Sequence, residues 1–179
     1  MARHCPNLLT AARLVLAVLL AGALVQYRPG WALLWWGTAV LTDLLDGWLA
    51  RRLDACSLRG ALFDATADFV LLWSAFAVWV WRGAYPAWFL LLLALLFGQF
   101  LLSARRGRLV YDPVGKYYGT ALYAALGALL LLPDYLFSYA LLAGLTGLAA
   151  VSLSVKVWWQ WRQTISPSST NDRFTLYGR

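Results

Sequence analysis

Long apolar stretches separated by short polar joints account for most of the chain. Six such stretches run over about residues 8–27, 31–51, 58–81, 87–103, 114–132 and 135–161. Each is close to the length of about 20 residues that a helix needs to cross bilayer hydrocarbon. Helix-breaking residues occupy most of the joints, at Pro29-Gly30, Gly83, Pro86, Pro113 and Pro133-Asp134. The pattern therefore predicts an all-α integral membrane protein with six transmembrane helices.

The composition agrees with this pattern and excludes several classes of protein. Hydrophobic residues make up 62% of the 179-residue chain and charged residues only 13%, whereas about a quarter of the residues of an average soluble domain are charged. The 11 Trp and 9 Tyr residues suit the aromatic belts found at membrane surfaces. In so apolar a chain, the net charge of +7 favours membrane lipids as partners, and we expect no binding to nucleic acid.

The basic residues are distributed unevenly over the joints. If the N-terminus is cytoplasmic, only Arg28 and Arg82 of the 15 Lys and Arg residues fall on the outer side. Positive residues concentrate on the cytoplasmic side of membrane proteins, so both the N- and the C-terminus are predicted to be cytoplasmic. Residues 1–162 are predicted to form the membrane domain, and the polar segment 163–179 a loose cytoplasmic tail.

Four aspartates lie in the second and third apolar stretches, where a simple membrane anchor would have none. Asp43 and Asp46 are three residues apart, and Asp64 and Asp68 are four apart, so each pair shares one face of a helix. Consecutive spans joined by a short turn run antiparallel. We therefore expect the two acidic faces to meet at the cytoplasmic end of the helices.

Several carboxylates gathered near hydrocarbon need a compensating charge. An ionised Asp at the centre of a membrane helix costs about 2.5 to 3.5 kcal/mol, and neighbouring like charges add to that cost. A divalent cation removes both penalties, and ligation by oxygen alone suits hard ions such as Mg²⁺, Mn²⁺ or Ca²⁺. No His or Cys cluster accompanies the acids, which argues against zinc. Hard cations held by Asp, often in pairs, are typical of phosphate-ester chemistry.

Small residues accompany the acids. Gly47 and Ala50 share the acidic face of the second stretch, and Gly60 lies on the corresponding face of the third. Side chains this small would let a ligand approach the helix backbone. Arg51 is predicted to bind a diphosphate through its guanidinium group.

Together these positions form a motif with fixed spacing. They fit the signature D-x2-D-G-x2-A-R-x8-G-x3-D-x3-D, with Asp43, Asp46, Gly47, Ala50, Arg51, Gly60, Asp64 and Asp68 at its fixed positions. On this motif the chain resembles the CDP-alcohol phosphotransferase family. The segment Pro6-Asn7-Leu8-Leu9-Thr10-Ala11-Ala12-Arg13 also resembles the opening of phosphatidylglycerophosphate synthase-like members of that family.

The resemblance implies an enzyme that transfers a phosphatidyl group from CDP-diacylglycerol to a small alcohol, with two Mg²⁺ or Mn²⁺ ions as cofactor. The acceptor hydroxyl would attack the β-phosphorus, and CMP would leave. By the same resemblance, Asp43, Asp46 and Asp64 are metal ligands, and Asp68 is both a metal ligand and the general base. The CDP site would be formed by Asp43, Gly47, Ala50, Arg51 and Gly60. We also expect a homodimer in the bacterial inner membrane, with its active site facing the cytoplasm.

The sequence specifies the acceptor less narrowly than the donor. Glycerol 3-phosphate is the expected acceptor, and the candidates for binding its phosphate are Arg105, Arg106, Arg108 and Lys116, although these residues could also simply flank the membrane. The segment from Gly115 to Thr120 resembles the G-K-x-K-T stretch of phosphatidylglycerophosphate synthases, but Tyr118 replaces the second Lys and Gly119 is inserted. The Pro and Lys of the D-P-x-A-D-K sequence, common in those members around the last two acids, are also missing. Inositol phosphate, serine and a lipid alcohol remain alternative acceptors.

Two other classes of protein are alternatives to the enzyme. A small membrane transporter could use the acids as a cation path, but this hypothesis predicts acids near the bilayer midplane and inverted repeats. These acids instead lie towards one end of their helices, and no inverted halves are visible. A purely structural membrane protein gives no reason for buried acids. The sequence therefore favours the transferase.

Overall fold

Six α-helices make up the described part of the molecule. The structure is a computed structural model, which describes residues 5–52, 58–105 and 113–165. The helices are α1 (Cys5–Val25), α2 (Pro29–Arg52), α3 (Leu58–Trp81), α4 (Ala87–Arg105), α5 (Pro113–Leu131) and α6 (Tyr135–Ile165). No β-strand occurs within these ranges. The predicted all-helical fold is confirmed, and each helix matches one predicted stretch to within a few residues.

The last helix is longer than its apolar stretch. Helix α6 continues to Ile165, so the first three residues of the predicted tail, 163–165, are helical. The rest of the predicted tail, 166–179, lies outside the described residues.

Local sequence explains several of the helix ends. Helices α2 and α5 both begin at a proline, Pro29 and Pro113, which suits the first helical position because proline has no amide hydrogen to leave unpaired there. Two residues after the ends of α1 and α3 comes a residue with positive φ, Tyr27 at 56° and Gly83 at 75°. In both, the amides of this residue and of the next one bond back to carbonyls of the last turn, as in the common C-terminal cap that glycine favours.

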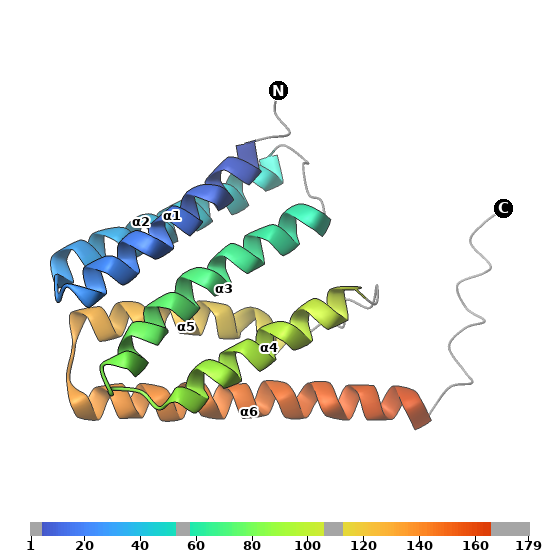
Figure 1. The fold of residues 1–179 in the computed structure, drawn as a ribbon. Helices are drawn as coiled ribbons and strands as arrows, with labels where there is room; N and C mark the ends of the chain where they lie inside the picture. Colours follow the sequence, from blue (N-terminus) through green and yellow to red (C-terminus); the bar gives the residue numbers. More distant parts are fainter. Residues whose placement is uncertain (1–4, 53–57, 106–112, 166–179) are drawn as a thin grey trace.

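The six helices pack in a closed ring, and one further contact joins two helices across it. Helix α1 packs against α2 and α3, α5 against α2 and α6, and α4 against α3 and α6, while α3 and α5 touch across the ring. Figure 1 shows α1 and α2 side by side at one edge, with α6 at the opposite edge. Among the described residues, α2 and α3 make no direct backbone approach, although they are consecutive in the chain. Helix α1 lies against both of them.

An aromatic cluster fixes the joint between α3 and α4. Phe76, Tyr85 and Phe89 pack with ring centroids 5.3 to 5.9 Å apart, and all three are buried. The Tyr85 hydroxyl donates a hydrogen bond to the carbonyl oxygen of Ser138 on α6, at 3.2 Å. Burial raises the pKa of Tyr85 to about 12, because a phenolate there would lose its hydration. The hydroxyl therefore stays protonated and ties α6 to this joint.

Much of the outer surface is apolar. Val18 of α1, Leu91 of α4 and Leu136 of α6 are 72%, 62% and 78% exposed, which suits a surface that faces lipid. By length and composition, two segments are apolar enough to cross a membrane, Leu62–Trp81 and Tyr135–Val155. Three shorter apolar helical segments accompany them, Thr10–Val25, Ala87–Leu102 and Tyr117–Leu131. Two candidate spans are thus found among the described residues, and six crossings stay a prediction.

Candidate active site

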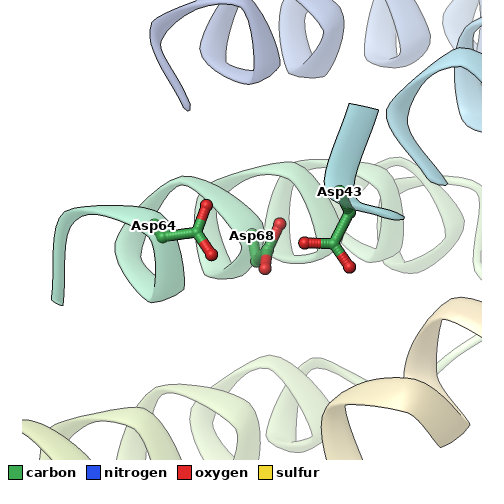
Figure 2. A group of neighbouring side chains, drawn as sticks. All are labelled: Asp43, Asp64 and Asp68. Atoms are coloured by element: carbon green, nitrogen blue, oxygen red, sulfur yellow. The ribbon is translucent and has the colours of Figure 1, made fainter. Parts of the chain in front are cut away.

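Three of the four predicted aspartates come together in the structure. Asp43 lies on α2, and Asp64 and Asp68 lie one turn apart on α3. One carboxylate oxygen from each lies within 4.8 Å of the others. Figure 2 shows the three side chains in a row, with Asp68 between Asp64 and Asp43 in this view. Their side chains are 44%, 34% and 25% exposed for Asp43, Asp64 and Asp68, so the cluster is partly open to a ligand.

The third helix of the site is α1, which the sequence analysis did not include. The Arg13 side chain is fully buried. Its Nη1 lies 2.6 Å from Oδ1 of Asp68 and 2.7 Å from Oδ1 of Asp64, and its Nη2 lies 3.2 Å from Oδ1 of Asp43. One guanidinium group therefore bridges the carboxylates of α2 and α3.

The expectation that the two acidic faces meet directly needs a correction. The carboxylates do converge, but the helices that carry them do not pack on each other within the described residues. Because α1 packs against both, its side chains fill the space between the two acidic helices. Thr10, one turn before Arg13, donates to Oδ1 of Asp64 at 3.5 Å. The signal in the sequence is an arginine inside an apolar stretch, where an unpaired charge is costly.

Tyr123 of α5 is a second contributor that the sequence analysis missed. Its hydroxyl donates a hydrogen bond to Oδ1 of Asp68 at 2.8 Å. Its own carbonyl oxygen accepts a hydrogen bond from Nε1 of Trp36 on α2, at 3.1 Å. The contact could not be predicted because a tyrosine in an apolar helix has no distinctive spacing relative to the acids. Through Tyr123 and Trp36, α5 and α2 are both tied to the position of Asp68.

The donor set fits a hard divalent cation. Three carboxylates offer oxygen ligands within 4.8 Å of one another, and oxygen ligands are those that Mg²⁺ and Mn²⁺ prefer. With all three ionised and Arg13 protonated, these four side chains carry a net charge of −2, which one divalent cation would neutralise. The cluster is thus suited to bind a divalent metal ion.

For the other predicted site residues, the structure describes only the backbone or does not describe the residue at all. Asp46, Gly47, Ala50 and Arg51 are in the last turns of α2, Gly60 is in the first turn of α3, Arg105 ends α4, and Lys116 is in the first turn of α5. The side chains of Asp46, Ala50, Arg51, Arg105 and Lys116 lie outside the described part of the structure, as do Arg106 and Arg108 entirely. The predicted binding roles of these residues stay predictions.

Comparisons with known proteins identify the family of the chain. The profile of the CDP-alcohol phosphatidyltransferase family matches residues 3–158 of the chain. The CDP-diacylglycerol–glycerol-3-phosphate 3-phosphatidyltransferase of Escherichia coli (strain K12) is 32% identical over 151 residues, which cover 76% of this chain and 82% of that protein.

Two relatives from Streptomyces match shorter segments, and each match covers less than half of the relative's own length. The cardiolipin synthase (CMP-forming) of Streptomyces coelicolor is 35% identical over 94 residues, which cover 49% of this chain and 44% of that protein. The phosphatidylinositol phosphate synthase of Streptomyces avermitilis is 41% identical over 75 residues, which cover 37% of this chain and 30% of that protein. No solved structure matches the chain significantly. The profile match over most of the sequence shows that this chain belongs to the CDP-alcohol phosphatidyltransferase family.

Proposed function

We propose that this protein transfers a phosphatidyl group from CDP-diacylglycerol to glycerol 3-phosphate and releases CMP. The observation that carries the proposal is the gathering of carboxylate oxygens from Asp43, Asp64 and Asp68 within 4.8 Å. The similarity to an Escherichia coli enzyme whose name states this donor and this acceptor supports it over 82% of that protein's length. Phosphatidyl transfer by a member of this family also explains why acids from two helices converge in an otherwise apolar chain, which a scaffold does not.

The aspartates divide into binding and proton-accepting roles in this proposal. Asp43, Asp46, Asp64 and Asp68 hold the metal, which is proposed to be two Mg²⁺ or Mn²⁺ ions, and Asp68 also accepts a proton. When bound, such a cation neutralises the diphosphate and stabilises the departing CMP. Asp43, Gly47, Ala50, Arg51 and Gly60 form the site for the CDP group.

Asp68 is the proposed general base. Both contacts that the structure gives its carboxylate, from Arg13 and from Tyr123, fall on Oδ1. Oδ2 is therefore the oxygen that we propose takes the proton of the acceptor hydroxyl as attack proceeds. The new bond joins the acceptor oxygen to the β-phosphorus, the bond from that phosphorus to the bridging oxygen breaks, and CMP leaves with the electron pair.

The acceptor's phosphate is proposed to bind four basic residues that lie in the sequence between the last residue of α4 and the first turn of α5. These are Arg105, Arg106, Arg108 and Lys116. Lys116 precedes Tyr123 by seven residues on α5, about two helical turns, which places both positions on the same side of that helix. The Streptomyces relatives are named for other products, cardiolipin and phosphatidylinositol phosphate. Inositol phosphate and lipid alcohols therefore stay alternatives to glycerol 3-phosphate, as does serine.

We further propose that the protein lies in the bacterial inner membrane with six crossings, cytoplasmic termini and a cytoplasmic active site. The exposed apolar residues and the uneven distribution of Lys and Arg support this orientation. A site at the cytoplasmic end would let water-soluble substrates reach a lipid whose acyl chains stay in the bilayer. A homodimer, implied by the family resemblance, stays a prediction.

An acceptor panel tests the proposed function directly. The purified protein is placed in lipid vesicles with mass-tagged CDP-diacylglycerol and Mg²⁺, and offered glycerol 3-phosphate, inositol phosphate, serine or phosphatidylglycerol in separate reactions. We expect phosphatidylglycerophosphate and an equal amount of CMP with glycerol 3-phosphate, and loss of both products when EDTA is added. A tagged product with another acceptor would reassign the acceptor, and CMP release that survives EDTA would contradict the metal role.

Replacing Tyr123 with Phe is expected to slow turnover about 10- to 100-fold. The change removes the hydrogen bond to Asp68 Oδ1, and bonds to charged groups contribute about 1.5 to 3 kcal/mol, so the proposed base loses part of its orientation. The measurement is kcat at saturating substrates and Mg²⁺. Tyr139→Phe is the matched control, because it removes an exposed bond to the hydroxyl of Tyr135 on α6, outside the aspartate cluster. A Tyr123→Phe enzyme within twofold of wild type would show that the hydrogen bond does not position the base.

A further inference from the structure

The buried guanidinium of Arg13 occupies the same carboxylate oxygens that a metal ion would use. We propose that Arg13 is an internal counter-ion, which holds the aspartate cluster together in the absence of metal and weakens its affinity for divalent cations. This inference rests on the proposed function only in that the carboxylates bind such a cation. Arg13 is a positioning residue in this view, since it acts through the aspartates.

The geometry shows why the cluster needs a cation when no metal is bound. Oxygens of three carboxylates lie within 4.8 Å of one another, so the ionised groups repel strongly in a partly buried site. Arg13 contacts all three, with nitrogen–oxygen distances of 2.6, 2.7 and 3.2 Å to Asp68, Asp64 and Asp43. Asp43 is on α2 and the other two are on α3, two helices whose described residues do not pack directly. The guanidinium therefore links the carboxylates of two helices that do not contact each other directly.

Arg13 depends on the aspartates as much as they depend on Arg13. Arg13 is fully buried, and a buried charge is tolerated only while its partners compensate it. A divalent cation on the same aspartates neutralises those partners and leaves Arg13 with weaker compensation. By linkage, a metal that weakens the hold on Arg13 must in turn be bound more weakly because Arg13 is present. Removing the arginine charge should therefore tighten metal binding.

Removing Arg13 should also weaken metal binding, because the carboxylates are then no longer held in place. We expect this effect to be smaller than the effect of the lost charge. Without Arg13 the three carboxylates would spread apart, and the metal would have to gather them. The cation, however, replaces the lost bridge itself once it is bound, because it ligates the same carboxylates. We therefore expect the charge effect to dominate the change in metal affinity.

Two variants distinguish the effect of the positive charge of Arg13 from the effect of its contacts with both α2 and α3. Arg13→Gln removes the positive charge, whereas Arg13→Lys keeps it but offers one nitrogen in place of the two that now bridge α2 and α3. The readouts are Mn²⁺ affinity, from the free Mn²⁺ signal in electron paramagnetic resonance, and Tm in detergent, in EDTA and in saturating Mn²⁺. Neither depends on turnover.

The expected results are specific. Arg13→Gln should bind Mn²⁺ at least tenfold more tightly than wild type, with a lower Tm in EDTA and a larger rise in Tm on adding Mn²⁺. Arg13→Lys should lower Tm in EDTA by less and should keep Mn²⁺ affinity within about threefold of wild type, a margin well below the tenfold step that corresponds to about 1.4 kcal/mol. Unchanged or weaker Mn²⁺ binding by Arg13→Gln would overturn the proposal.

Arg82→Gln is the matched control. Arg82 also packs against α1, where it donates to the carbonyl oxygen of Leu24 and covers the ring of Tyr27 at 3.7 Å. It makes no described contact with the aspartates, so its loss should lower Tm equally in EDTA and in Mn²⁺ and leave Mn²⁺ affinity unchanged. A selective change of Mn²⁺ affinity in Arg82→Gln would contradict the assignment of this effect to the cluster.

Mn²⁺ binding by the wild type and the folding of Arg13→Gln also test the proposal. A wild-type protein that binds no Mn²⁺ would overturn the proposed metal site itself, whereas wild-type binding with an unaltered Arg13→Gln affinity would overturn only the counter-ion role. If folded Arg13→Gln protein can be purified only in Mn²⁺, this agrees with the expected instability without metal. Its Mn²⁺ affinity is then measured by competition with a chelator. If it cannot be recovered even in Mn²⁺, the proposal fails, because the cation should replace the arginine.

Discussion

Replacing Asp68 with Asn is expected to lower the rate of CMP release by about 10²- to 10⁴-fold, the usual contribution of a general base. Asparagine keeps the size of the side chain and an oxygen for Arg13 and Tyr123 to contact. It cannot accept the proton of the acceptor hydroxyl, because its amide is not basic. The measurement is kcat with glycerol 3-phosphate and CDP-diacylglycerol in vesicles, at Mn²⁺ concentrations that saturate the variant.

Metal binding separates the two roles proposed for Asp68. If it is mainly the base, Asp68→Asn should still bind Mn²⁺, whereas Asp64→Asn should lose both Mn²⁺ binding and turnover. Asp134→Asn is the control, since Asp134 is an exposed aspartate in the joint before α6, and this variant should turn over as wild type does. Wild-type turnover by Asp68→Asn would rule out the base assignment.

Replacing Gly127 with Ala is expected to destabilise the fold by about 1 to 3 kcal/mol, the usual effect of overpacking. A Cβ at this position of α5 would lie 2.6 Å from Cη2 and 2.9 Å from Cε2 of Trp36, and nearer still to Cζ2. Small residues are common where membrane helices approach closely, and here the glycine admits the indole ring of α2. Since Nε1 of Trp36 donates to the carbonyl oxygen of Tyr123, displacing the ring also disturbs the tyrosine that contacts Asp68.

The stability loss is measured as a fall in Tm in detergent, and we expect reduced kcat alongside it. Gly144→Ala on α6 is the control, because a Cβ there meets nothing within 4 Å and alanine favours the helix by about 0.5 to 1 kcal/mol over glycine. Combining Gly127→Ala with Trp36→Leu should restore part of the loss, since the smaller side chain makes room. A Gly127→Ala protein as stable as Gly144→Ala would show that the ring moves aside without cost.

The helices were predictable because their signals are local. A run of apolar residues between breakers sets both the start and the length of a membrane helix, so α3 (Leu58–Trp81) matches its predicted range at both ends. The spacing of Asp64 and Asp68 fixes their shared face in the same way. Residue spacing and the short joint between α2 and α3 therefore predicted that the acids converge, but not that α1 packs against both acidic helices.

The rest of the site depends on how the helices pack, which spacing does not encode. Nothing local in the sequence indicates that α1 packs against both α2 and α3, so the contacts of Arg13 with the aspartates could not be predicted. Tyr123 and Trp36 contribute through contacts that span 55 and 87 residues of sequence. Membrane helices associate mainly through detailed packing and polar contacts, and not through an apolar face that a sequence reveals.

The order of the chain gives the buried arginine a further consequence during biosynthesis. Polypeptides emerge from the ribosome with the N-terminal part first, so α1 is available before the two helices that carry the acids. Inserting an unpaired aspartate into a bilayer is unfavourable. A nascent chain that already contains the guanidinium offers each acidic helix an ion-pair partner as it arrives, before the cell has to supply any cofactor.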